Sequence, residues 1–248
     1  MGLPVHIGLW DAALVVAVSA QCTVISYLRE PKWKAVAMSL PIPFTFGSMA
    51  LGKPVGVTHV TGLLTFLLFM HAVRVLHSRG HLKIVPAIAA CCGTYCVVGA
   101  ILARTLPGSE AAFWTVIGVV SVVSVTLYLT VPPRKERAYR TPLPLSKKLP
   151  ILVGLIGAIV LMKDLLRGFM PMFPMVGTIT AYEARHGLWT VCRQIPALLI
   201  AFVPMMIVIH LTQHAVGLGK SLAAGWVVFL AILWPSTWRM WSAERKQW

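Results

Sequence analysis

Long apolar runs alternate with short polar segments over the whole chain. A transmembrane helix needs about 20 apolar residues, and nine runs reach or approach that length. We predict spans at residues 9–28, 35–52, 57–77, 83–104, 112–131, 149–166, 169–184, 187–211 and 218–238. The second and seventh are short and contain prolines, so each either crosses the bilayer or re-enters it. The pattern predicts an all-α polytopic membrane protein.

Composition strengthens this interpretation. Of the 248 residues, 58% are hydrophobic and 12% are charged, whereas soluble domains are about 25% charged. The first apolar run lacks the basic region and small-residue cleavage site of a signal peptide, so we expect it to be retained as a span.

The charge distribution predicts the orientation. The net charge is +15, but the Lys and Arg residues lie in short loops between spans, which favours anionic lipid headgroups over nucleic acid as neighbours. Nine spans place 16 of the 22 basic residues on one side. The positive-inside rule then puts the N-terminus outside and the C-terminus in the cytoplasm. We assign the chain to a cell membrane, the inner membrane of a bacterium.

Two similar segments suggest an internal repeat. SLPIPFTFGSMALGKPVG in the first half corresponds to FMPMFPMVGTITAYEARHG in the second. The matched pairs are Pro41–Pro171, Pro43–Pro174 and Gly47–Gly177. An offset of five spans inverts the second unit, as in many secondary transporters. The predicted parts are a four-helix repeat at 1–108, a linking helix with a basic cytoplasmic linker at 109–148, and a second four-helix repeat at 149–248.

The second half also resembles a known family. GFMPMFPMVGTITAY, with the spans around it, is similar to the small GlpM-like four-helix membrane proteins, which have a comparable proline–phenylalanine–proline break. The resemblance covers about residues 150 to 240, and the first half more weakly. It implies a duplicated four-helix unit and supplies no catalytic residues.

The paired prolines predict a central site. Proline removes a helical hydrogen bond, and carbonyls freed in lipid need partners in protein or water. Pro41, Pro43, Pro171 and Pro174 therefore predict two breaks that meet around a polar cavity. The alternative is that these prolines only kink the helices for packing.

Polar residues near the breaks are candidates for binding. The candidates for an anionic or amphipathic substrate are Arg193, Arg185, His186, His59, Thr45 and Thr178. For proton coupling they are Glu183 and Asp164. The alternatives are interfacial charges around Glu183, an intrahelical ion pair at Asp164, and a packed structural histidine at His59. Glu136 is expected to be solvated.

Catalytic and metal-binding motifs are missing from the sequence. The five cysteines lie in apolar runs without zinc spacing, so we expect no metal and no cofactor. The favoured hypothesis is a transporter or lipid flippase, with membrane lipids and the substrate as partners and a homodimer left open. Alternatives are a membrane enzyme acting on a lipid-linked substrate and a non-catalytic assembly subunit.

Overall fold

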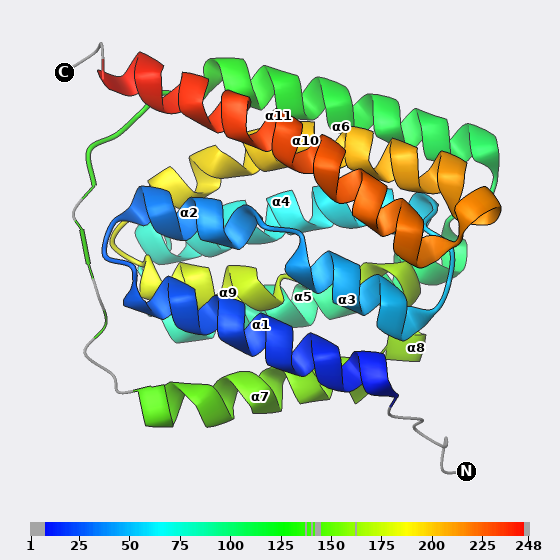
Figure 1. Ribbon diagram of the computed structural model, residues 1–248. Helices are drawn as coiled ribbons and strands as arrows, with labels where there is room; N and C mark the ends of the chain where they lie inside the picture. Colours follow the sequence, from blue (N-terminus) through cyan, green and yellow to red (C-terminus); the bar gives the residue numbers. More distant parts are fainter. Residues whose placement is uncertain (1–7, 137, 140, 142–144, 162, 246–248) are drawn as a thin grey trace.

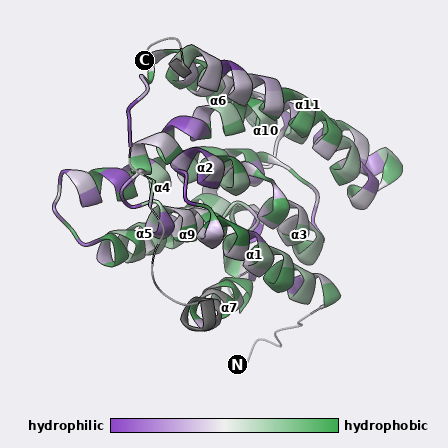
Figure 2. Cartoon of the chain, turned by 60° about the vertical axis from the view of Figure 1, so that its left-hand side comes forward, coloured by the Kyte–Doolittle hydropathy of each residue, from purple (hydrophilic) through white to green (hydrophobic). Residues whose placement is uncertain are grey.

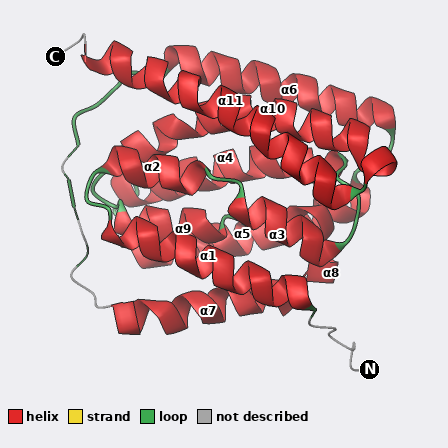
Figure 3. Ribbon diagram, viewed as in Figure 1, coloured by secondary structure: helices red, strands yellow, loops and turns green. Residues whose placement is uncertain are grey.

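The computed structural model describes residues 8–136, 138–139, 141, 145–161 and 163–245. This part of the chain is helical and contains no strand (Figure 3). The elements are α1 (Leu9–Tyr27), α2 (Pro31–Ser39), α3 (Ile42–Leu51), α4 (Val57–Ser78), α5 (Ile84–Thr105), α6 (Glu110–Thr130), α7 (Leu145–Leu161), α8 (Lys163–Leu166), the 3-10 turn η1 (Arg167–Phe169), α9 (Met175–Glu183), α10 (Leu188–Val216) and α11 (Leu218–Arg245).

Among the residues that the structure describes, six helices are long and apolar enough to cross a membrane. They are α1, α4, α5, α6, α10 and α11. The all-helical prediction is confirmed, and these helices support an integral membrane protein. The predicted spans at 35–52 and 169–184 fall on short helical pieces, α2–α3 and η1–α9. The predicted span at 149–166 falls on α7 and α8, and the residue between them lies outside the described part of the chain.

Proline causes both interruptions. The first break lies between α2 and α3, where Leu40 precedes Pro41 and takes an extended backbone with ψ 130°, as expected for a residue before proline. The second break comprises residues 170–174, between η1 and α9, and Pro174 immediately precedes α9. Each broken segment therefore consists of two short helical pieces joined by non-helical backbone.

The helices lie roughly along one common direction, and the two broken segments run side by side in opposite directions (Figure 1). In that view α2 leads to α3 from left to right, whereas α8 leads to α9 from right to left. On the outside of the bundle, α6 packs against both α4 and α10 (Figure 1).

One end of the bundle collects hydrophilic loops. It is formed by residues 28–30, 79–83, 131–136, 138–139, 141 and 184–187, and we call it the basic end. Figure 2 shows hydrophilic colour in these loops and mainly hydrophobic colour along the helices. Helix α1 begins at the opposite end (Figure 1).

Glycines allow the central segments to approach closely. A Cβ atom added at Gly47 would lie 2.9 Å from the Cα of Pro171, and one at Gly62 would lie 2.6 Å from the Cβ of Met172. Small residues serve the same purpose between membrane helices in general. The first broken segment and α4 are therefore packed directly on the second break.

Candidate functional site

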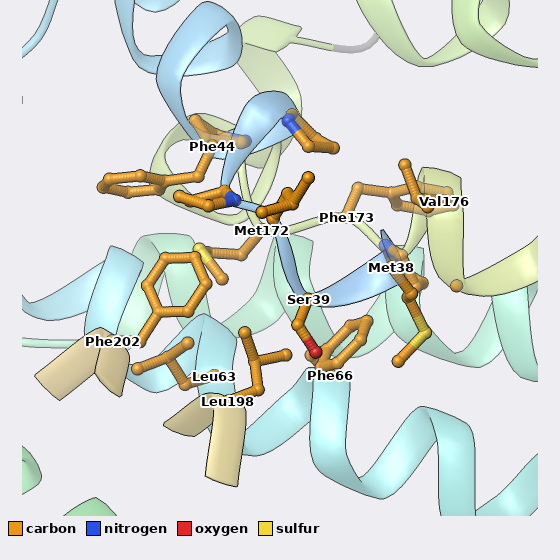
Figure 4. A pocket seen from close by; sticks show the side chains of 16 residues that line it. Met38, Ser39, Phe44, Leu63, Phe66, Met172, Phe173, Val176, Leu198 and Phe202 are labelled. Carbon is orange, nitrogen blue, oxygen red and sulfur yellow. The ribbon is translucent and has the colours of Figure 1, made fainter. Parts of the chain in front are cut away.

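A small cavity of about 50 Å³ lies between the two proline breaks (Figure 4). All four predicted prolines line it, together with residues from α4 and α10. The lining residues are Met38, Ser39, Leu40, Pro41, Pro43, Phe44, Leu63, Phe66, Pro171, Met172, Phe173, Pro174, Val176, Gly177, Leu198 and Phe202.

The cavity is apolar rather than polar. Ser39 is the one polar side chain among the described lining residues, and its hydroxyl donates to the carbonyl of Ala35 at 2.9 Å. A volume of about 50 Å³ has room for a few waters and no more. The expectation of two breaks around a cavity fits this geometry, but a substrate would require the cavity to open.

Side chains from neighbouring helices satisfy the freed carbonyls. Gln21 of α1 donates its Nε2 to the carbonyls of Ala37 and Leu40, at 2.8 and 3.3 Å. At the second break, the Tyr95 hydroxyl of α5 donates to the carbonyl of Phe169 at 3.1 Å. An unpaired backbone group is costly in a membrane interior, so these two residues stabilise the breaks.

The predicted threonines and His59 do not line the cavity. Thr45 accepts a hydrogen bond from Trp226 Nε1 at 2.8 Å, which ties α3 to α11. The hydroxyl of Thr178 donates to the Met175 carbonyl within α9. His59 is buried at the start of α4, with its Nδ1 3.3 Å from the amide nitrogen of Gly56 and its ring edge-on to Phe44. These three residues stay candidates without a place in the cavity wall.

The predicted charged cluster lies at the basic end. Arg185 donates to the Tyr182 carbonyl and to the Tyr139 hydroxyl, and its guanidinium also lies over the ring of Tyr139. His186 is exposed and packs edge-on against Tyr139. Burial, and secondarily the positive charge of Arg185, lower the pKa of His186. Arg193 donates from Nε to the Val131 carbonyl at the end of α6, so it reaches the bundle end and does not extend into the cavity.

Residues 131–141, as far as they are described, form a connecting segment that lies on the helices. The Glu136 carboxylate accepts hydrogen bonds from the amides of Trp189 and Thr190, at 3.1 and 2.7 Å. It therefore caps the first turn of α10, where the helix dipole favours an anion. The expectation that Glu136 is solvated is wrong.

Lys34 is a functional candidate that the sequence reasoning missed. It is 1% exposed, and its Nζ donates to the carbonyls of Tyr139 and Glu183, at 2.8 and 2.6 Å. Glu183 ends α9, so Lys34 places a positive charge where the helix dipole favours one. It joins α2 of the first half to α9 of the second and to the connecting segment.

The sequence contained a signal for Lys34. The buried residues of α2 are Pro31, Lys34, Ala35, Met38 and Ser39, which is the spacing of an apolar helix face. Our predicted span began at residue 35, and Lys34 was therefore counted as a loop charge.

A second charged contact joins the halves at the opposite end. Lys163 of α8 donates to the Oδ2 atom of Asp11 in α1 at 2.8 Å, and the Asp11 side chain is 3% exposed. The backbone of Asp164 lies in α8, but its side chain falls outside the described part of the structure. Across the described residues, no group of three or more His, Cys, Asp or Glu could hold a metal ion.

Comparison of the chain with protein-family models, with curated proteins and with solved structures found no match. The resemblance to GlpM-like proteins therefore stays a prediction.

Proposed function

We propose that this protein is a membrane transporter or lipid flippase, built as an inverted repeat of nine spans, that moves an amphipathic substrate between its two broken helices. The observation that supports the proposal most is the meeting of the two proline breaks around one cavity. Interrupted helices in corresponding positions of two halves are the usual pointer to a transporter site.

Contacts between the halves provide the second support. At the basic end Lys34 holds the end of α9, and at the opposite end Asp11 holds Lys163. Alternating access requires the halves to separate first at one end and then at the other. Charged contacts at both ends, with only a small cavity between them, fit a state of such a cycle in which neither end has separated.

The cavity lining favours one class of substrate. Phenylalanine, methionine and proline side chains surround the cavity (Figure 4), and no described charged side chain lines it. An amphipathic substrate fits better than a small anion, because its apolar part would pass the breaks while basic residues contact its headgroup at the bundle end. Glu183 and Asp164 remain our candidates for proton coupling.

The test uses proteoliposomes and a reversible lock. A Cβ added at Gly62 would lie 2.6 Å from the Cβ of Met172, whereas a disulfide needs about 3.5–4.5 Å, so a shift of roughly 1 Å allows a bond. In a background without the five native cysteines, Gly62→Cys with Met172→Cys should link α4 to the second break. We expect flipping of a fluorescent phospholipid to stop on oxidation and to return on reduction.

The two single-cysteine variants are matched controls and should be unaffected by oxidation. Flipping that persists in the fully cross-linked protein would refute a path through the breaks. Absence of flux for lipids and for amphipathic anions, together with a new chemical product in detergent, would indicate a membrane enzyme instead.

A further inference from the structure

A second cavity lies outside the centre, between α4 and α5. Its volume is about 230 Å³, several times that of the central cavity. Its wall is mostly apolar, with two threonines and a tyrosine. The lining residues are Thr65, Leu68, Phe69, Ala72, Leu76, Ala90, Cys91, Thr94, Tyr95 and Val98. We call it the α4–α5 groove.

The groove opens on the outer surface of the bundle. Leu68 is 65% exposed and Val98 37% exposed, and both helices are long and apolar enough to span a membrane. The medium at this surface is therefore the hydrocarbon of the bilayer. From Thr65 to Leu76 the groove follows α4 for roughly 16 Å at 1.5 Å per residue, about half of a ~30 Å hydrocarbon core. That length matches one acyl chain in one leaflet.

The groove ends where positive charge begins. Leu76 lines it near the basic end, and the turn from α4 to α5 follows with Arg79 and Lys83, both exposed. Within the described part of the chain, neither of these two forms an ion pair. Basic residues beside the membrane attract anionic lipid headgroups. An acyl chain in the groove would thus place its phosphate close to two available cations.

Tyr95 connects the groove to the central site. Its side chain lines the groove, its hydroxyl donates to the Phe169 carbonyl just before the second break, and its ring lies edge-on to Phe173, with 5.1 Å between centroids. Phe173 in turn lines the central cavity. A chain in the groove would therefore contact a residue that holds the second break.

We propose that the α4–α5 groove binds an anionic membrane phospholipid, with one acyl chain along the groove and the phosphate at Arg79 and Lys83. The binding itself does not depend on transport; only the idea that this lipid is the substrate rests on the proposed function. The groove would then be the entry position from which a lipid reaches the second break.

The test measures binding without flux. The purified full-length protein in mild detergent is titrated with phosphatidylglycerol or phosphatidylcholine, and bound lipid is counted by native mass spectrometry. We expect wild type to prefer phosphatidylglycerol about tenfold, because each basic residue near a headgroup adds to the attraction. Arg79→Gln with Lys83→Gln should remove the preference, whereas Arg104→Gln, at the other end of α5, should keep it.

A second pair of variants tests the groove. Thr94→Trp fills it and should reduce binding of both lipids at least tenfold. Val97→Trp, on the same helix but outside the lining, should bind as wild type does. Equal binding by these two variants, or a preference that survives loss of both basic residues, would overturn the inference.

Transport then separates the two proposals. If Thr94→Trp loses lipid but flipping continues, the groove is not the entry position and the pathway through the breaks stands. If wild type binds phosphatidylglycerol as expected but flips nothing, the transporter proposal fails and the lipid site stands.

Discussion

Replacing Gly47 with alanine should push the two broken segments apart. The added Cβ would lie 2.9 Å from the Cα and 3.1 Å from the Cβ of Pro171, and neither atom can move without the backbone of the second break. Overpacking of this kind costs about 1–3 kcal/mol, while alanine returns about 0.5–1 kcal/mol in helix propensity. We expect a net loss of about 1–2 kcal/mol.

Gly118→Ala is the matched control, because nothing lies within 4 Å of its added Cβ in α6. It should be neutral or stabilising by up to about 1 kcal/mol. At about 2–4 °C per kcal/mol for a chain of this size, the Tm values of the two variants should differ by roughly 2–12 °C.

The melting can be followed with a thiol-reactive fluorophore, since Cys22 and Cys192 are buried at 0% and 3% exposure and react only when the helices separate. A Gly47→Ala protein that melts at or above the Gly118→Ala protein would refute the close packing of the two breaks.

Three further predictions concern other contacts. Lys34→Met should lower the free energy of unfolding by about 1–3 kcal/mol, since two carbonyls lose their donor. The control Lys53→Met changes an exposed residue and should stay within about 0.5 kcal/mol of wild type. Equal Tm values for the two variants would contradict the role of Lys34. Gln21→Leu should speed amide hydrogen exchange in α2 and α3 far more than in α11, and uniform exchange would disprove its role at the first break. An NMR titration should give His186 a pKa below its ordinary value of about 6.5. Its contribution to stability is therefore complete above about pH 6.5 and is lost as the pH falls through the lowered pKa of the folded protein. Arg185→Gln should raise the pKa of His186. An unchanged pKa would show that the positive charge of Arg185 does not lower it.

The positions of the breaks could be predicted because proline acts locally. Pro41 and Pro171 each remove a helical hydrogen bond, and each is followed within three residues by a second proline. Single prolines such as Pro204 stay inside a continuous helix, α10, so it is the closely spaced pairs that located both interruptions. The correspondence between the two segments also led us to expect that the breaks meet, and the cavity between them fits that expectation.

The cavity wall could not be predicted from helix periodicity. Counting faces at 3.6 residues per turn requires an unbroken helix, and each break resets the phase of the helix that follows it. Thr45 and Thr178 both lie just after a break, and both turn out to bond elsewhere. His59 lies in the first turn of α4, which follows a loop, so the direction of its side chain could not be predicted either.

Lys34 and Arg193 show a related limit. Both are long basic side chains near helix ends, and either could extend to solvent or fold inward. The predicted spans put Arg193 inside 187–211 and leave Lys34 in the loop before 35–52. In the structure, Lys34 lies on the buried face of α2 and Arg193 extends to the end of α6. The connecting segment supplies a carbonyl to each, Tyr139 to Lys34 and Val131 to Arg193.

The connecting segment has a mechanical consequence. It is the covalent link between the two halves and is also fastened to α2, α9 and α10 through Lys34, Arg185 and Glu136. In the step of the proposed cycle in which the basic end stays closed, the connecting segment would act as the pivot of the movement. A rotation of about 10° would displace the far end of a ~30 Å bundle by roughly 5 Å. The Asp11–Lys163 contact lies at that far end, so a pair of distance probes placed there would register the largest movement in the molecule.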